Sequence, residues 1–119
     1  MTSGADYNRS EELRARRDGA VLVKNSGRGM RKGDARRGSF LIDYKFTEKK
    51  SYALNVDTFN AFVQQSFLEG LAPVVVAVFE QHKGKAIAMI DWDYLMDMHD
   101  ELQGLRDYYK QEQEREMWS

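Results

Sequence analysis

The chain has 119 residues, of which 42% are hydrophobic and 31% are charged, values that indicate one soluble globular domain with a modest core. The absence of cysteine excludes disulfides and thiolate zinc sites, and the longest apolar run, residues 72–79, is too short to cross a bilayer. The net charge of −1 conceals an asymmetry, because residues 1–50 carry 13 Lys and Arg against 7 Asp and Glu, whereas residues 51–119 carry 5 against 12. A basic first half suits a polyanionic partner, or else it is a solvated face balanced by the acidic tail.

The first half of the chain predicts a helix and two strands around a glycine-rich loop. Residues 1–7 lack a pattern and should fray, and residues 1–17 have no apolar signal core, so we expect a cytoplasmic protein rather than an exported one. Ser10 can cap a helix over residues 10–18, which Gly19 would end. A strand over 20–24, a loop over 25–38 and a strand over 39–46 follow.

Alternation along the second strand assigns its side chains to two faces. Phe40, Ile42, Tyr44 and Phe46 share one face, and Leu41, Asp43 and Lys45 share the other.

The second half predicts one further helix, two or three strands and a long terminal helix. Residues 51–54 can form a short strand, and Asp57 is the expected N-cap of a helix over 58–69 that Gly70 ends. The apolar stripe of that helix is Phe59, Phe62, Val63 and Phe67. Residues 72–81 predict a strand buried on both faces, and residues 86–90 another. The fold class is therefore α/β: a single domain with a mixed central β-sheet flanked by helices and a C-terminal helix over 91–117.

The terminal helix carries a heptad-like apolar seam. It is formed by Leu95, Met98, Leu102, Leu105 and Tyr109, and the charged residues after it should fray. The seam can cover the sheet of its own domain, or it can pair with the same helix of a second chain.

Two acidic residues and a lysine are the candidates for chemistry. Asp34 ends the glycine-rich loop, and Asp43 lies on the next strand with Lys45 two residues along, on the same face. Two carboxylates suit magnesium, which keeps several waters in its coordination shell, and the Tyr44 carbonyl can be a further ligand. The alternative is an ion pair of Lys45 with Asp43 or Asp34.

The segment "GMRKGD", followed by a strand ending in "DYK", resembles the PD-(D/E)xK nuclease superfamily, and above all its small Holliday junction resolvases of archaeal and phage type. The similarity covers residues 10–79. It implies a restriction-endonuclease-like fold, a homodimer, magnesium as cofactor with manganese as a substitute, and cleavage of phosphodiester bonds in branched DNA.

The resemblance also implies roles for individual residues. Asp34 and Asp43 would hold magnesium, and Lys45 would be the catalytic lysine. Ser26 would be the loop serine near the metal or the scissile phosphate, and Glu11 or Glu12 the helix glutamate. The resemblance further implies a bacterial or phage-infected host cell. Gly33 stands where the family has proline, and the second acid is Asp rather than the commoner Glu.

The basic residues around the loop would then contact phosphates without reading sequence. They are Lys24, Arg28, Arg31, Lys32, Arg36 and Arg37. Two other functions stay open: a nickase or restriction-like nuclease on duplex or single-stranded DNA, and a non-catalytic nucleic-acid-binding module.

Overall fold

The computed structural model describes residues 4–22 and 34–118 of the protein, with side chains from residue 10 onward. The chain divides into two compact units, Met1–Met89 and Ile90–Ser119. The described strands and the first two helices belong to the first unit, and one long helix forms the second. The single domain expected over the whole chain stays a prediction.

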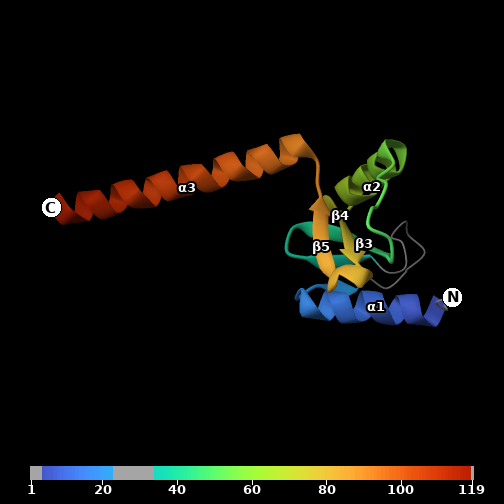
Figure 1. Ribbon diagram of the computed structural model, residues 1–119. Coiled ribbons are helices and arrows are strands. Elements are labelled where there is room, and N and C mark those ends of the chain that lie inside the picture. The colour runs from blue at the N-terminus through green and yellow to red at the C-terminus, as the bar shows by residue number, and fades with distance from the viewer. Residues whose placement is uncertain (1–3, 23–33, 119) are drawn as a thin grey trace. The chain divides into compact units, whose positions relative to one another are not determined.

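The elements alternate between helices and strands, as Figure 1 shows. In chain order they are α1 (Gly4–Arg17), β1 (Val21–Leu22), β2 (Ala35–Arg37), β3 (Phe40–Thr47), α2 (Val56–Leu68), β4 (Ala72–Phe79), the 3₁₀ turn η1 (Glu80–His82), β5 (Lys85–Met89) and α3 (Trp92–Trp118). The predicted α/β class with a long C-terminal helix is confirmed.

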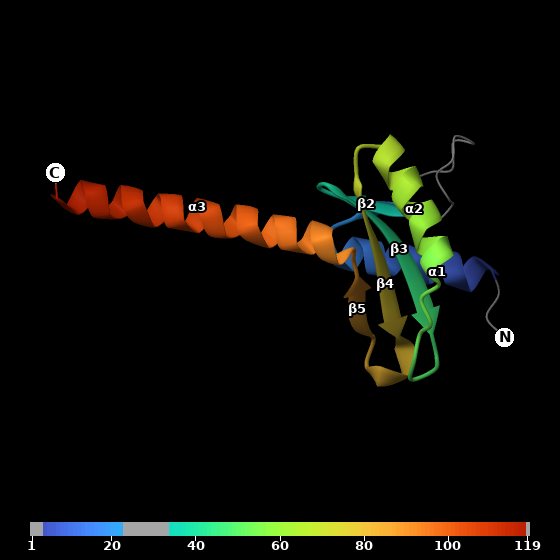
Figure 2. The same ribbon diagram turned by 90° about the horizontal axis from the view of Figure 1, so that it is seen from above.

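The described strands form one mixed sheet in the order β1-β2-β3-β4-β5. Neighbouring strands are antiparallel except β3 and β4, which are parallel and are joined through α2. In Figures 1 and 2, α1 and α2 lie on opposite faces of the sheet. Any side chain on the sheet therefore faces one helix or the other.

Strand β3 sorts its side chains between these two faces, as its alternation predicts. Ile42 and Tyr44 are buried in a cluster with Ala15 of α1. Leu41 is buried instead in a cluster with Phe62 of α2. Because successive strand residues point to opposite faces, Asp43 and Lys45 lie on the Leu41 face, which α2 covers.

Helices α1 and α2 both end in the glycines that the sequence indicates. After α1, Gly19 has a φ of 70° and the Ala20 N–H donates to the Ala15 carbonyl at 2.7 Å. After α2, Gly70 has a φ of 68° and the Leu71 N–H donates to the Ser66 carbonyl at 2.9 Å. These are Schellman turns, which need a residue that tolerates positive φ.

Strand β4 is buried on both faces of the sheet, which confirms the burial predicted for this strand. Val74, Val75, Ala77 and Val78 are all buried, although they alternate between the two faces. The strand ends at Phe79 rather than at the expected residue 81 because residues 80–82 form the 3₁₀ turn. Lys83 and Gly84 then adopt positive φ and reverse the chain into β5.

Several predicted boundaries are wrong. Helix α1 begins at Gly4, within the segment expected to fray, and a short strand β2 lies inside the expected loop 25–38. Residues 51–54 form no strand. The N-cap of α2 is Asn55, whose Oδ1 accepts the Thr58 N–H at 3.0 Å, so Asp57 lies in the first turn instead.

The apolar stripe of α2 is also narrower than its sequence indicates. Phe62 is buried, whereas Phe67 is 81% exposed. Ser66 takes the buried position, and its hydroxyl donates to the Phe62 carbonyl at 2.8 Å. This bond satisfies the hydroxyl within the helix, which lets a small polar residue occupy a packed position.

The second unit is a single helix without a break from Trp92 to Trp118. Asp91 caps it by accepting the Tyr94 N–H at 3.0 Å. The charged end was expected to fray, but it remains helical up to Trp118. Side-chain pairs such as Arg115–Glu112, at 3.2 Å, stabilise this part of the helix. No helix in the described part of the chain is long and apolar enough to span a membrane. Both readings of the heptad seam stay predictions.

Candidate functional site

The pairing of β2 with β3 brings Asp34 and Asp43 together. Ala35 pairs with Ile42 and Arg36 with Leu41, so continuing this antiparallel register by one residue places Asp34 opposite Asp43. Opposite residues on antiparallel strands share a face, with Cβ atoms about 4.5–5.5 Å apart. Ala35 and Ile42 pack toward α1, which leaves the two aspartates on the face of α2. Residues nine positions apart in the sequence thus become neighbours across the β2–β3 hairpin.

Asp34 is a buried carboxylate with a partner on α2. It is 1% exposed, and Gln65 Nε2 donates to its Oδ2 at 3.5 Å. Burying a carboxylate is costly unless other groups interact with it, so this contact helps to hold the acid in place. The sequence analysis missed Gln65. Its signal is the spacing of three residues from Phe62, which puts both on the sheet-facing side of α2.

Lys45 and Asp43 form the ion pair that the sequence offered as an alternative to a metal site. Lys45 Nζ lies 3.3 Å from Asp43 Oδ2. The Asp43 side chain is 13% exposed and that of Lys45 is 38% exposed, so the amine is the more accessible group. The pair therefore places one positive and one negative charge side by side at the candidate site.

Glu11 of α1 belongs to the same electrostatic environment. Burial raises its pKa above the ordinary value, the charge of Asp43 raises it further, Lys45 lowers it and Asp34 raises it. These effects require the four groups to lie near one another. Strand β2 pairs with only the first three residues of β3, so a side chain from α1 can approach Asp43 past the end of β2.

Glu12 lies in a different place. It is exposed, and its Oε1 accepts a hydrogen bond from Arg16 Nη2 at 3.2 Å. The sequence left the choice between Glu11 and Glu12 open, and the structure brings only Glu11 into the electrostatic environment of the two aspartates.

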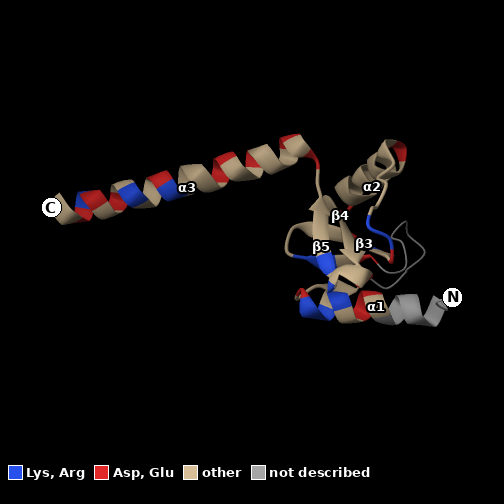
Figure 3. Ribbon diagram, viewed as in Figure 1, with Lys and Arg blue, Asp and Glu red and all other residues tan. Residues whose placement is uncertain are grey.

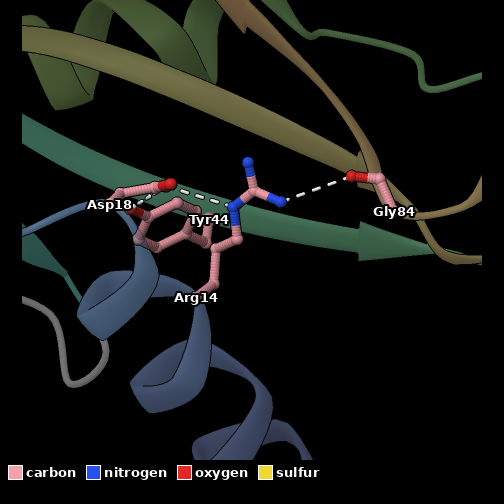
Figure 4. Close-up of polar contacts among 4 residues, drawn as sticks. All are labelled: Arg14, Asp18, Tyr44 and Gly84. Atoms are coloured by element: carbon pink, nitrogen blue, oxygen red, sulfur yellow. Dashed lines mark hydrogen bonds and ion pairs between the residues drawn. The ribbon is translucent and has the colours of Figure 1, made fainter.

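Tyr44 lies between Asp43 and Lys45 but turns its side chain toward α1. Its hydroxyl donates to Asp18 Oδ2 at 2.8 Å, and Arg14 Nε donates to the same oxygen at 3.1 Å (Figure 4). Arg14 Nη1 also donates to the Gly84 carbonyl at 3.3 Å. Burial and the hydrogen bond to Asp18 raise the pKa of Tyr44. Only the backbone carbonyl of Tyr44 remains a candidate ligand at the site.

This network fixes α1 against the sheet. Arg14 stands three residues after Glu11 on the helix, so its contacts with Asp18 and Gly84 also hold the turn that carries Glu11. The sequence analysis did not identify the network, because Tyr44 and Gly84 lie far along the chain from Arg14 and Asp18 and no motif links them.

The predicted phosphate-binding residues divide into two groups. Lys24, Arg28, Arg31 and Lys32 lie outside the described residues, as does Ser26, the candidate loop serine. Arg36 and Arg37 are described and exposed. By register, Arg36 shares the face of Asp34, whereas Arg37 pairs with Phe40 on the α1 face. Arg36 is therefore the better placed of the two for a ligand at the aspartates.

Further basic residues, which the sequence analysis did not select, lie at the end of α1. Arg16 and Arg17 are exposed in its last turn, where Figure 3 shows a run of Lys and Arg. Cations are favourable at a helix C-terminus, so the helix dipole alone is sufficient to explain them.

No three His, Asp or Glu side chains within the described residues are arranged to hold a metal ion. The donor set nevertheless fits magnesium, which needs only one or two carboxylates and completes its shell with water. Asp34 and Asp43 supply those carboxylates on one face. Burial raises the pKa of Glu11 most, and the charges of Asp43 and Asp34 add to it; a cation held by the two aspartates would offset their negative charge.

Comparisons of the chain with protein-family models, with curated proteins and with solved structures find no match.

Proposed function

We propose that the protein is a magnesium-dependent, structure-selective DNA endonuclease that resolves Holliday junctions. The observation that carries this proposal is the register that places Asp34 opposite Asp43, with Lys45 Nζ 3.3 Å from Asp43. Glu11 of α1 feels the charges of all three. Simple phosphate binding does not need carboxylates beside the lysine. Metal-dependent hydrolysis of a phosphodiester uses carboxylates to hold the cation and a group that accepts the proton of water.

Each of these side chains has a role in the proposed reaction. Magnesium, when held by Asp34 and Asp43, would supply positive charge beside the phosphate and make its water more acidic. Glu11 is a stronger base than an ordinary carboxylate because its pKa is raised, so it can accept a proton from water. Lys45 can hydrogen-bond a phosphate oxygen. Water adds to phosphorus and one P–O ester bond breaks, leaving a phosphate monoester and a hydroxyl.

The order of elements supports the proposed relationship to PD-(D/E)xK nucleases. A helix bearing Glu11 precedes the loop, Asp34 ends the loop, β3 carries Asp43 and Lys45, and a helix and a buried strand follow. The short strand β2 is an additional element between the loop and β3, and its register with β3 places the two aspartates opposite each other. We propose that the sheet and its two helices form a restriction-endonuclease-like core.

The proposed substrate also implies an assembly. Symmetric cleavage of a four-way junction needs two active sites at a fixed separation, which a two-fold homodimer supplies. Light scattering of the protein alone should give the mass of a dimer, and a monomer would require a different arrangement on the junction.

The test is cleavage of a synthetic four-way junction in the presence of magnesium. Wild-type protein should cut it, and Asp34→Asn and Lys45→Ala should each lower the rate by about 100-fold or more. Asp97→Asn and Lys110→Ala, at exposed positions of α3, are the matched controls and should cut normally. Equal cleavage by all five proteins would remove the proposed mechanism.

Linear duplex and single strands in the same assay separate a resolvase from a nickase or a restriction-like nuclease. Preference for the junction supports the resolvase. Equal cleavage rates on duplex DNA would support the proposed hydrolysis but contradict the preference for junctions.

A non-catalytic nucleic-acid-binding module is the second candidate, and one observation favours it. Lys45 and Asp43 already neutralise each other at 3.3 Å, as in a structural ion pair. Such a module would bind DNA with an affinity that falls steeply with salt, and would cut no substrate with magnesium or manganese. Wild-type cleavage that Lys45→Ala abolishes would exclude it.

A further inference from the structure

A cavity of about 150 Å³ lies directly beside the candidate site. Asp43 and Lys45 form one wall, α2 forms another, and residues 52–55, which lead into α2, form a third. The cavity is partly open, so a group that enters it remains connected to a ligand outside. Its position makes it a continuation of the surface on which the aspartates lie.

The interior of the cavity is apolar and aromatic. Phe62 and Val75, both buried, lie at its base. Tyr52 and Phe59 line it and are only partly buried, so each keeps some ring surface accessible. Aromatic rings with accessible surface are the usual partners for stacking nucleobases.

Polar groups at the cavity can hydrogen-bond the edge of a flat ligand. Asn55 lines the cavity, and its Oδ1 already accepts the Thr58 N–H at 3.0 Å. The carboxamide nitrogen of Asn55 is consequently the group that remains to donate to a ligand. Lys45 Nζ, in the wall that it forms with Asp43, is a second donor. Two donors around an aromatic interior suit a ring with carbonyl oxygens.

The size of the cavity restricts the ring. A cavity of about 150 Å³ lined by apolar side chains is large enough for a benzene-sized molecule. A pyrimidine has one six-membered ring, whereas a purine adds a fused five-membered ring. The volume of the cavity is therefore sufficient for a single pyrimidine ring.

We propose that the cavity binds one unpaired pyrimidine base next to the phosphate that is cut. A base inside a duplex cannot enter, because entry requires the base to leave its stack. Branch points and mismatches supply unstacked bases at low cost, so the cavity would couple recognition of DNA structure to cleavage. This inference rests on the proposed nuclease function and adds a preference for the base beside the cut.

Direct binding of a free nucleotide tests the cavity without relying on cleavage. Thymidine 5′-monophosphate, titrated into the protein, should shift the amide resonances of residues 52–55 and Thr58. 2′-Deoxyguanosine 5′-monophosphate should shift them at least about tenfold less at the same concentration. Equal shifts by both nucleotides, or shifts confined to other residues, would overturn the proposal.

A matched pair of substitutions locates the binding. Ala53 lines the cavity and is exposed, so Ala53→Phe fills the space with little cost to folding. Ala61→Phe makes the same change at an exposed position of α2 that does not line the cavity. Ala53→Phe should lose thymidine binding by about tenfold or more, and Ala61→Phe should retain it. Equal binding by both variants contradicts the assignment.

Cleavage separates failure of this inference from failure of the nuclease proposal. Junctions that differ only in the base beside the cut should be cleaved faster with a pyrimidine, and Ala53→Phe should lose that ratio. Cleavage without a base preference would overturn the proposal that the cavity binds a pyrimidine, but would leave the nuclease proposal intact. Thymidine binding without any cleavage would contradict the proposed nuclease function and the link between base binding and cleavage. It would still support a cavity that binds a pyrimidine.

Discussion

The amine of Lys45 lies 3.3 Å from the carboxylate of Asp43, and both charges act on the ionisation of Glu11. Burial is the largest cause of the raised Glu11 pKa, the charge of Asp43 adds to it, and Lys45 opposes it. Two residues of β3 therefore influence the ionisation of a residue on α1. A change to Asp43 or Lys45 should be measurable at Glu11.

The Glu11 pKa should respond to its neighbours with opposite signs. Asp43→Asn removes a negative charge and should lower this pKa, whereas Lys45→Met removes a positive charge and should raise it. Carboxyl carbon chemical shifts of Glu11 across a pH titration measure both changes. Asp57→Asn, at an exposed position of α2, is the control and should leave the pKa unchanged. Shifts of the same sign in both variants would mean that the site has rearranged.

Glu11 should cost the protein stability at neutral pH. Its pKa is raised in the folded state, so folding disfavours the ionised form, and stability is lost as the pH rises through that pKa. Glu11→Gln cannot ionise and should unfold at a higher temperature than wild type at pH 7. The difference should shrink as the pH falls from the raised folded-state pKa toward 4.5, the ordinary value for Glu, and should vanish below it.

The same substitution should lower cleavage by about 100-fold or more, because it removes the proposed proton acceptor. Glu12→Gln, one residue along and exposed, should gain no stability and should cut normally. A Glu11→Gln protein that is less stable than wild type at pH 7 would contradict the electrostatic account of the site.

Gln65 should support the binding of a divalent cation through Asp34. Gln65→Leu removes the donor that lies 3.5 Å from Asp34 Oδ2, and loss of such a support typically weakens metal affinity by about 10- to 100-fold. The magnesium concentration needed for half-maximal cleavage measures the effect. Gln64→Leu, at the exposed neighbouring position, is the control. Equal magnesium dependence in both variants would show that Gln65 does not assist Asp34.

The main elements of the sheet could be predicted because their signals are local. Alternation in β3 assigned Asp43 and Lys45 to the correct face, and the apolar run of β4 indicated burial on both sides. Gly19 and Gly70 marked the ends of α1 and α2 because only a residue that tolerates positive φ completes those turns.

The errors arise where tertiary contacts decide the outcome. Strand β2 consists of Ala35, Arg36 and Arg37, which carry no strand pattern, and forms by pairing with β1 and β3. The choice of Glu11 over Glu12 depends on how α1 packs against the sheet. Gln65 and the Arg14–Asp18–Tyr44 network involve partners distant in sequence, which no local pattern reveals.

The hydroxyl of Tyr44 should contribute to stability through Asp18. Tyr44→Phe keeps the buried ring and removes the hydrogen bond of 2.8 Å, which should cost about 1 kcal/mol in free energy of unfolding. Denaturant titration measures the loss, and Tyr108→Phe, at an exposed position of α3, should lose much less. If both variants unfold at the same denaturant concentration as wild type, the contact does not stabilise α1 against the sheet.

Two phenylalanines of α2 should differ sharply in their contribution to stability, although both belong to its expected apolar stripe. Phe62 is 1% exposed and packs with Leu41 and Val75, so Phe62→Ala should lower the free energy of unfolding by about 3–5 kcal/mol. Phe67 is exposed, and Phe67→Ala should change the free energy of unfolding by less than about 0.5 kcal/mol. Denaturant midpoints of the two variants provide the measurement. A large loss in Phe67→Ala would mean that this ring is covered in solution, and would place a partner surface on the outer side of α2.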